Sequence, residues 1–373
     1  MDRRFRYFLF ENYDPEQVGP GQEEPRALLG PGLDAVLSRA ADFFPGRCPR
    51  ALLEDEFSPE LISRLISAGL FRAEGPRVWF DTPIFLRSDA PILAAWLWEQ
   101  APRLTARLAE HWARLRELAC SIQNDFPPEV NLYHVLCGMV FDGLFLDRLS
   151  QGGVLASSRV HGDGLDYLTI LYEDCPELNA LSDGLLCSWN RFGDGQTTLQ
   201  TFGDSAGVRW DLYRFARLRE QGCLNGRFQQ VQERFGPYLD EAGRAGVLAQ
   251  VRLLADTGRC HPACIGLLER FGYCQDGALC VPVFRREDQA TVRAVAALVE
   301  QVLYEETGRV LSAARHELDL TAVAHRVPAG EVANELYHLL FGSVNEALVS
   351  QGLVAAPPTR AGEGRYLRSV QLF

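Results

Sequence analysis

The chain has 373 residues, of which 47% are hydrophobic and 23% charged, and its formal net charge is −12. This length exceeds one ordinary hydrophobic core, so we expect roughly two or three packed units in a globular protein. All 37 basic residues are arginine, which excludes chemistry that needs a lysine amine, such as a Schiff base or a phosphate-loop lysine. The acidic balance also opposes broad, non-specific binding to nucleic acid.

The N-terminal segment, residues 1–34, begins with MDRRFRYFLFENYDPEQ. It lacks the apolar core and the small-residue cleavage site of a secretory signal. No apolar run in the chain reaches the roughly 18 residues of a membrane span. The sequence therefore predicts a cytoplasmic protein without a membrane partner, in which the ten cysteines are reduced.

Residues 51–85 show the order helix, turn, helix and hairpin. Ser58 and Pro59 suit the N-cap and the first position of the second helix, and Gly69 suits its C-terminal stop. The apolar residues between them follow helical spacing: Leu61, Ile62, Leu65 and Ile66. Two short strands are then expected around the turn Glu74-Gly75-Pro76.

Long amphipathic helices are expected at 89–123 and 287–318. The first has an apolar stripe formed by Leu93, Trp96, Leu97, Leu104, Leu108, Trp112 and Leu115. Such a helix can act as a spacer or bind a partner. Packing between neighbouring parts of the same chain is the favoured interpretation, because tertiary contacts supply most helical stability.

One stretch of the sequence occurs twice. YHVLCGMV at 133–140 and YHLLFGSV at 337–344 share five of eight positions. The match continues in the same order elsewhere, with SPELISRLISAGLF at 58–71 against HPACIGLLERFGYC at 261–274, and TPIFLRSD at 82–89 against VPVFRRED at 281–288. These matches indicate an internal duplication in which residues 235–373 repeat residues 35–175. Residues 176–234 form a connector that has no counterpart.

The stretch ISRLISAGLFRAEGPRVWF resembles the recognition helix and wing of the winged helix-turn-helix superfamily. So do LDRLSQGGVLASSRVHGDGLDYLTILYE (146–173), IGLLERFGYCQDGALCVPVF (265–284) and NEALVSQGLVAAPPTRAGEGRYLRSVQLF (345–373). This resemblance implies a mainly α fold with small β-hairpins (α+β). It would contain four winged-helix units in two duplicated halves, each with a long linking helix. The alternative is a set of unrelated helix–hairpin pieces in one large α+β fold.

The resemblance implies DNA binding through the second helix and the wing of each unit. The four candidate recognition helices carry no excess of basic residues. The arginines that could contact the DNA phosphates would therefore lie in the wings. The candidate DNA-contacting residues are Arg72, Arg77, Arg360, Arg365 and Arg368. They are too few for tight binding at physiological salt unless the protein dimerises, and a solvated terminal hairpin is the alternative interpretation of the last three.

Paired winged helices also serve as protein-binding blocks, in accessory subunits of bacterial chromosome-organising complexes and in some polymerase subunits. This chain is similar to them in arrangement only. An acidic surface without lysine suits protein binding better than autonomous DNA recognition. We therefore expect a non-enzymatic interaction or assembly element with a protein partner, including one in a DNA-associated complex. A DNA-binding transcriptional regulator is the alternative, and the sequence leaves a homo-oligomer open.

The second alternative function is a small-molecule sensor or enzyme, with its site in the connector at residues 187–215. Aromatic, charged and glycine residues gather there, as in many ligand-binding loops. The candidate ligand-binding residues are Trp189, Asn190, Arg191, Asp194 and Asp204. Asp-Gly and Gly-Asp pairs are equally typical of hairpin turns.

For the remaining candidate residues, the cysteines and histidines, a structural role is the favoured interpretation. Cys260, His261, Cys264, Cys274 and Cys280 lie close together, but no CxxC spacing occurs, which favours buried thiols over a zinc site. His134 and His338 occupy matched positions, and a core hydrogen bond is favoured over catalysis. No phosphate loop, dinucleotide fingerprint or hydrolase motif appears, so we expect no cofactor and no metal.

Overall fold

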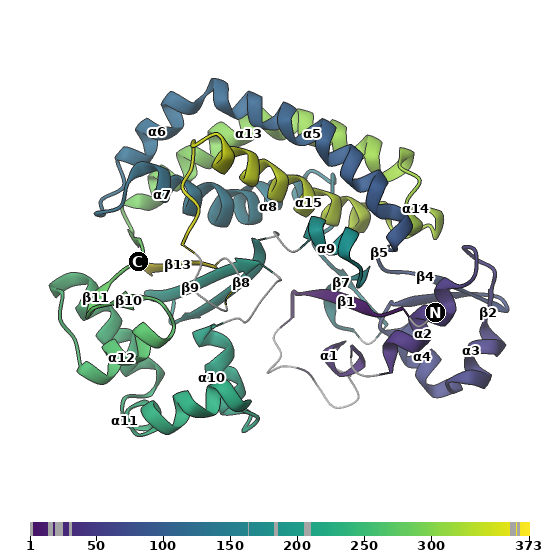
Figure 1. The fold of residues 1–373 in the computed structure, drawn as a ribbon, viewed down its shortest axis with the longest axis horizontal. Coiled ribbons are helices and arrows are strands. Elements are labelled where there is room, and N and C mark those ends of the chain that lie inside the picture. Colours follow the sequence, from purple (N-terminus) through teal and green to yellow (C-terminus); the bar gives the residue numbers. More distant parts are fainter. Residues whose placement is uncertain are drawn as a thin grey trace. The chain divides into compact units, whose positions relative to one another are not determined.

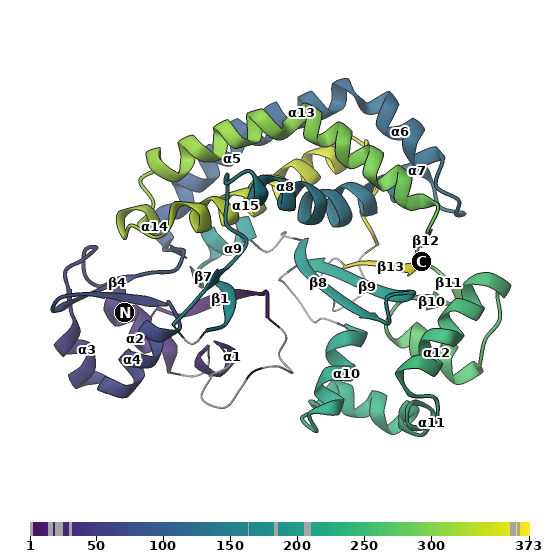
Figure 2. The same cartoon turned by 180° about the vertical axis from the view of Figure 1, so that it is seen from behind.

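The computed structural model describes residues 3–13, 18, 25–29, 32–162, 164–182, 186–204, 210–358, 363 and 366–373. Helices are in the majority and the strands form small, mostly antiparallel sheets, so the fold is mixed α+β (Figures 1 and 2). The chain divides into two compact units of three segments each. Unit 1 comprises Met1–Leu104, Leu146–Ser182 and Leu303–Val344, and unit 2 comprises Thr105–Phe145, Asp183–Val302 and Asn345–Phe373.

Unit 1 contains a small helical cluster followed by a hairpin (Figure 1). The helices are α2 (Leu33–Ala41), α3 (Arg50–Glu56) and α4 (Pro59–Ser67), and the paired strands are β2 (Cys48–Pro49), β4 (Arg77–Phe80) and β3 (Phe71–Glu74). The Ser58 hydroxyl accepts a hydrogen bond from the backbone nitrogen of Leu61 at 3.2 Å. Gly69 has a φ of 66°, in the left-handed region that glycine enters without strain. The predicted cap, stop and hairpin are therefore confirmed.

A second sheet in unit 1 is built on strand β7 (Asp166–Glu173). It pairs antiparallel with β1 (Phe5–Glu11) and β6 (Arg159–Val160), and parallel with β5 (Ile84–Phe85), where Ile84 lies opposite Leu171. Leu171 packs into the core of the helical cluster, which includes Val36, Leu53, Ile62 and Leu65. Short helices α1 (Pro25–Leu28) and α9 (Pro176–Ser182) also belong to this unit.

The sheet of unit 2 has the strand order β12-β13-β9-β8. Its strands are β12 (Val283–Arg285), β13 (Tyr366–Leu372), β9 (Thr197–Asp204) and β8 (Leu186–Gly193). Strand β12 runs parallel to β13, with Val283 opposite Val370, and the other pairs are antiparallel.

Helices pack beside the sheet of unit 2 and share a core with it. They are α10 (Leu212–Glu220), α11 (Gly226–Thr257) and α12 (Pro262–Arg270), followed by the hairpin β10 (Cys274–Gln275) and β11 (Ala278–Leu279). Phe215, Phe228 and Phe271 form an aromatic cluster in this core, with ring centroids 5.6 to 6.3 Å apart. Such contacts stabilise the unit beyond the apolar area that they bury.

Among the remaining helices, a boundary between the units falls within four: α5 (Ala90–Glu110), α8 (Phe145–Gln151), α13 (Asp288–Glu317) and α15 (Ala329–Ser350). The others are α6 (Trp112–Cys120), α7 (Pro128–Tyr133), the π-helical stretch η3 (His134–Leu144) and α14 (Thr321–Ala324). The helix predicted at 287–318 is confirmed as α13. The helix predicted at 89–123 is interrupted at His111, where φ is −105° and ψ is 10°.

Among the described residues, one helical stretch, Pro128–Gln151, is long and apolar enough to cross a membrane. Of its most apolar window, 61% is buried inside the fold. The core helix of a soluble protein passes the same test, so this stretch is weak evidence for a membrane span.

Two buried aspartates stand at the starts of α5 and α13. In unit 1, the Asp89 carboxylate accepts hydrogen bonds from the backbone nitrogens of Leu86 at 2.7 Å and Thr321 at 2.9 Å. In unit 2, the Asp288 carboxylate accepts from those of Arg285 at 2.7 Å and Gln123 at 3.2 Å. Both aspartates are 2% exposed, so each carboxylate needs these donors to replace water.

Helix α15 carries two buried glutamates in unit 1. The Glu335 carboxylate accepts a hydrogen bond from the Tyr172 hydroxyl, and burial raises the pKa of Glu335 to about 7 despite this bond and the nearby His338. Glu331 pairs with Arg159 at 3.0 Å, and burial likewise raises the pKa of Glu331 to about 7. Both carboxyl groups therefore bind a proton more tightly in the folded chain than in the unfolded one.

Replacing Glu335 by Gln should change how stability depends on pH. A carboxyl whose pKa rises on folding weakens the fold as pH increases from its ordinary value of 4.5 to about 7. At about pH 8, we expect Glu335→Gln to raise the unfolding free energy by about 2 kcal/mol, because no charge is then buried.

Urea unfolding of both proteins at about pH 6 and pH 8 measures the effect. The variant should keep part of the pH dependence, because Glu331 still titrates. An unfolding free energy that falls at pH 8 in the variant would contradict the expected cost of burying the Glu335 charge.

Candidate functional site

Arg72, a candidate DNA contact, is held by partners inside unit 1. Its Nε donates to Glu74 at 2.9 Å and its Nη1 donates to Asp81 at 3.0 Å. Its Nη2 donates to the backbone carbonyl of His325 at 3.3 Å, and the guanidinium lies 5.4 Å from the ring centroid of Trp79. A phosphate would have to compete with all of these partners for Arg72.

The other candidate arginines are placed differently. Arg77 is exposed on β4 and donates to the carbonyl of Gly46 at 3.2 Å. Arg368, on β13 of unit 2, is 6% exposed and its Nη2 donates to Glu363 at 2.6 Å. Arg360 and Arg365 lie outside the described residues. DNA binding by these residues stays a prediction, and Arg72 and Arg368 would need to give up internal partners for it.

The candidate ligand residues lie on the β8–β9 hairpin of unit 2. The Arg191 guanidinium lies 5.3 Å from the Trp189 ring, while the Asn190 amide donates to Asp211. Asp194 is in the hairpin turn, where its carboxylate accepts from the backbone nitrogens of Gln196 and Thr197, and these bonds lower the pKa of Asp194. Asp204 ends β9, and its side chain lies outside the described residues. Trp189 and Arg191 thus lie together, whereas Asp194 stabilises the turn.

The cysteine-rich stretch forms no ligand cluster: within the described part of the chain, no group of three or more His, Cys, Asp or Glu could hold a metal ion. Cys264 and Cys274 are buried, and burial raises the pKa of each thiol to about 12. His261 caps α12, where its Nδ1 accepts from the backbone nitrogen of Ala263 at 3.2 Å. Protonated thiols are poor metal ligands and poor nucleophiles.

The matched histidines are both core residues. In unit 1, the His338 Nδ1 donates to the carbonyl of Asn334 at 2.8 Å, and its ring stacks on Phe10. The predicted core hydrogen bond is thus confirmed for His338. In unit 2, burial lowers the pKa of His134 to about 3, so its imidazole is neutral at physiological pH.

A surface groove of about 460 Å³ lies in unit 1. Its lining combines the loop after α2, the chain before and at the start of α5, and the residues around α14. Its apolar residues include Phe43, Phe44, Leu86, Ile92 and Leu320, and its acids include Asp42 and Asp319. Phe44 is 84% exposed, so its ring offers apolar area to a partner rather than to the core.

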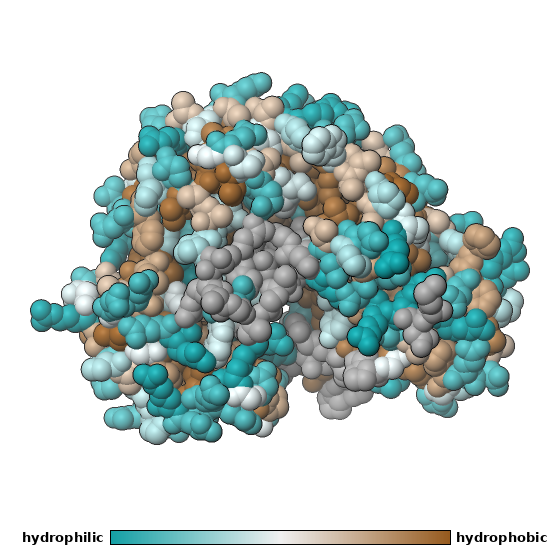
Figure 3. Space-filling view, viewed as in Figure 1, coloured by the Kyte–Doolittle hydropathy of each residue, from teal (hydrophilic) through white to brown (hydrophobic). Residues whose placement is uncertain are grey.

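The only sequence signal for this groove is the pair Phe43-Phe44 before Pro45-Gly46, which places aromatic rings beside a turn. One other large aromatic, Trp98 on α5, is equally exposed at 84%. On the face drawn in Figure 3, hydrophilic residues predominate over α11 and α12 in unit 2, with hydrophobic ones scattered between them. Single exposed apolar residues of that kind are ordinary on a soluble surface.

Comparisons with family models, with curated proteins and with solved structures found no match for this chain. Its function must therefore be argued from the residues and contacts described above.

The contacts of Arg72 predict a stability effect that Arg77 should not share. Because Arg72→Ala removes three hydrogen bonds, two of them to carboxylates, we expect the unfolding free energy to fall by about 2 kcal/mol. Arg77→Ala, on the next strand, should change it by less than about 0.5 kcal/mol.

Urea denaturation followed by circular dichroism compares the two variants. Equal, small effects would mean that the internal contacts of Arg72 are weak and that its guanidinium is available to an outside ligand.

Proposed function

We propose that this chain is a non-enzymatic, internally duplicated tandem winged-helix protein that acts as a protein-interaction or assembly element. The observation that carries the proposal is the groove of unit 1, where the exposed Phe44 ring stands beside Asp42 and Asp319. The matching partner is a protein segment with one apolar anchor side chain flanked by lysine or arginine. Apolar anchors in pockets dominate binding energy, and complementary charge supplies specificity and rate.

The strand pairing of the two units supports the duplication. The parallel pair of Ile84 with Leu171 and that of Val283 with Val370 span the same number of residues along the chain. Asp89 and Asp288 follow these strands at the same distance, and each accepts from the nitrogen three residues before it. These positions coincide with the matched sequences TPIFLRSD and VPVFRRED.

A reciprocal contact also supports it. In unit 1, the backbone nitrogen of Ala156 donates to the carbonyl of Gly330 at 2.9 Å, and in unit 2 that of Ala355 donates to the carbonyl of Glu129 at 3.1 Å. Ala156 and Ala355 are matched positions in the proposed duplication. In each proposed half, a residue after a helix bonds the start of a helix in the other proposed half, as equivalent positions of a duplication would.

The charges favour a protein over DNA as the partner. With a net charge of −12, the chain is repelled from a phosphate backbone. The described arginines that could face phosphates from a wing are Arg72, Arg77 and Arg368, and two of these are paired with carboxylates inside their own units. In the groove, Asp42 is ion-paired with Arg3 at 2.7 Å, so Asp319 is the acid that would attract a basic segment.

The duplication predicts that Asp89→Ala and Asp288→Ala have the same effect. Each substitution leaves two backbone donors without their acceptor, so we expect each to lower the unfolding free energy by about 3 kcal/mol. Asp147→Ala, at an exposed helical position, is the control and should cost less than about 0.5 kcal/mol. Thermal and urea unfolding measure all three, and a large loss at only one of the buried aspartates would argue against equivalent positions.

The groove is tested by photo-crosslinking. A benzoylphenylalanine in place of Phe44 should crosslink one host protein through a segment rich in lysine or arginine, identified by mass spectrometry. The same group in place of Trp98, which is equally exposed but outside the groove, is the control and should not. Reversing the rim charge with Asp319→Arg should lower the crosslink yield about tenfold, because it removes the attraction for the basic segment.

The alternatives predict different results. Equal yields at positions 44 and 98, or a yield unchanged by Asp319→Arg, would contradict a specific acidic groove. A crosslink to a second copy of this chain would make the surface a homo-oligomer contact. Steeply salt-dependent binding to duplex DNA without any crosslink would favour the transcriptional regulator.

A further inference from the structure

Strand β1 forms the outer edge of the sheet in unit 1 that is built on β7 (Figure 1). At one end of the pairing, the carbonyl of Arg4 accepts from the backbone nitrogen of Asp174 at 2.7 Å. At the other end, the backbone nitrogen of Asn12 donates to the carbonyl of Asp166 at 3.0 Å. Bonded and non-bonded positions alternate in an antiparallel ladder, so the odd-numbered residues of β1 direct their backbone groups away from β7.

These odd-numbered residues differ in what their backbone groups meet. The backbone nitrogen of Phe5 donates to the Asp34 carboxylate at 3.0 Å, which ends the available edge on that side. The backbone N–H and C=O groups of Tyr7 and Leu9 have no hydrogen-bond partner among the residues that the structure describes. Tyr7 is 43% exposed, so this part of the edge is accessible to an incoming strand.

The sheet of unit 2 shows how such an edge is filled. In both sheets a central strand, β7 or β13, has a short parallel strand on one side and an antiparallel strand on the other. Tyr7 lies opposite Leu171 and Leu199 lies opposite Val370, so Tyr7 and Leu199 occupy the same place. In unit 2 a fourth strand, β8, pairs antiparallel with β9 and places Phe192 opposite Leu199. The described part of unit 1 has no strand in that place.

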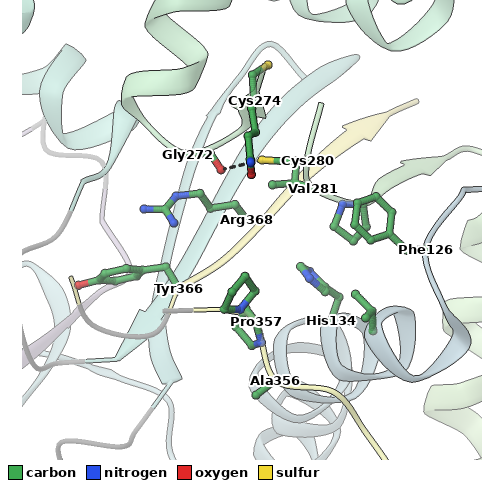
Figure 4. Close-up of a pocket in the computed structure, with 14 residues that line it drawn as sticks. Phe126, His134, Gly272, Cys274, Cys280, Val281, Ala356, Pro357, Tyr366 and Arg368 are labelled. Carbon is green, nitrogen blue, oxygen red and sulfur yellow. Dashed lines mark hydrogen bonds between the residues drawn. The ribbon is translucent and has the colours of Figure 1, made fainter. Parts of the chain in front are cut away.

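The cavity of unit 2 lies on a face of its sheet and not at an edge. It has a volume of about 540 Å³ and is lined by residues of three segments, within 126–134, 272–282 and 356–368 (Figure 4). Tyr366 and Arg368 line it from alternate positions of β13, and alternate side chains of a strand lie on one face. This cavity therefore leaves the backbone edges of the sheet unaffected.

Strand β1 lacks the features by which edge strands usually avoid pairing. Proteins protect such edges with proline, bulges or charged side chains. The strand FRYFLFE has no proline, its pairing with β7 has no register shift, and Tyr7 and Leu9 are uncharged. The outer strand of unit 2 is different, because β8 carries Arg191, and Arg244 Nη2 donates to the carbonyl of Gly193 at 2.8 Å.

The sequence of β1 matches a second copy of itself. An antiparallel pair centred on Phe8 places Tyr7 opposite the partner's Leu9, and Leu9 opposite the partner's Tyr7. The outward backbone groups of both copies then form reciprocal hydrogen bonds. Phe8 lies opposite the partner's Phe8 in a non-hydrogen-bonded pair, where side chains approach most closely and aromatic pairs stabilise the sheet.

The charges of the strand favour this antiparallel arrangement. Arg3, Arg4 and Arg6 lie at its start, and Glu11 lies at its end. Two-fold pairing about Phe8 brings the exposed Arg4 near the partner's Glu11, whereas parallel pairing would align each arginine with its own copy. Opposite charges across strands stabilise a sheet and like charges destabilise it.

We propose that β1 is a homodimer interface, at which it pairs antiparallel with β1 of a second copy and joins the two sheets across a two-fold axis. Such an interface uses the same surface of both copies. The inference rests on the strand pairing and not on the groove of unit 1, so either proposal can fail without the other.

The backbone hydrogen bonds are tested by substitution at Tyr7. Sedimentation of the full chain between about 1 and 100 µM should show a reversible equilibrium between the 41.6 kDa monomer and a dimer. Tyr7→Pro removes an outward N–H and keeps the bonds to β7, so it should weaken dimerisation about tenfold or more. Tyr7→Val keeps the N–H and a high strand propensity, and as the matched control it should dimerise nearly as the unchanged chain does.

The register is tested by disulfide crosslinking. With Phe8→Cys, the two new thiols face each other across the axis, and oxidation by glutathione disulfide should link them. With Arg4→Cys, the control, the two new thiols lie about eight residues apart along the strands, or about 26 Å, and should not link. Mass spectrometry of the linked peptides separates these products from any formed by the natural cysteines.

Circular dichroism establishes that each variant folds. If Phe8→Cys does not fold, the comparison of Tyr7→Pro with Tyr7→Val still decides. A chain that stays monomeric at all of these concentrations, a dimer that Tyr7→Pro leaves unchanged, or equal linking by Arg4→Cys and Phe8→Cys would overturn the proposal.

Discussion

The fold depends on a buried carboxylate at the start of α5 and another at the start of α13. Asp89 and Asp288 each hold the end of a strand, the first turn of a helix and a segment far away in sequence, through hydrogen bonds of 2.7 to 3.2 Å. A buried carboxylate keeps its charge only with such donors, so the three pieces must come together in one arrangement. The parallel strands before each aspartate and the antiparallel strands beside them are then fixed in register.

Arginine alone supplies the positive charge of the chain, and this shapes what the surface can do. Arg72, Arg159 and Arg368 form ion pairs with carboxylates inside their units, because a guanidinium can meet several acceptors at once. These three arginines are therefore engaged within their own units. The proposed partner of the exposed Phe44 beside the groove of unit 1 is therefore a basic protein segment rather than nucleic acid.

Local features of the fold could be predicted from the sequence, and distant ones could not. The Ser58 cap, the Gly69 stop and the hairpin after it depend on neighbouring residues, so the sequence pattern suffices. The break at His111 carries no proline or glycine signal, and the π-helical stretch His134–Leu144 has continuous apolar character that periodicity cannot resolve. The cavity around Arg368 depends on residues from three segments, and no short window of sequence contains them.

Each unit combines three segments that are separated in the sequence. In unit 1, strand β1 near residue 5 pairs with β7 near residue 173, and the first part of α15 comes from a third segment that begins at Leu303. The contacts that close each unit therefore join residues far apart in the sequence, and such non-local contacts carry a loop-closure cost that local helical contacts do not.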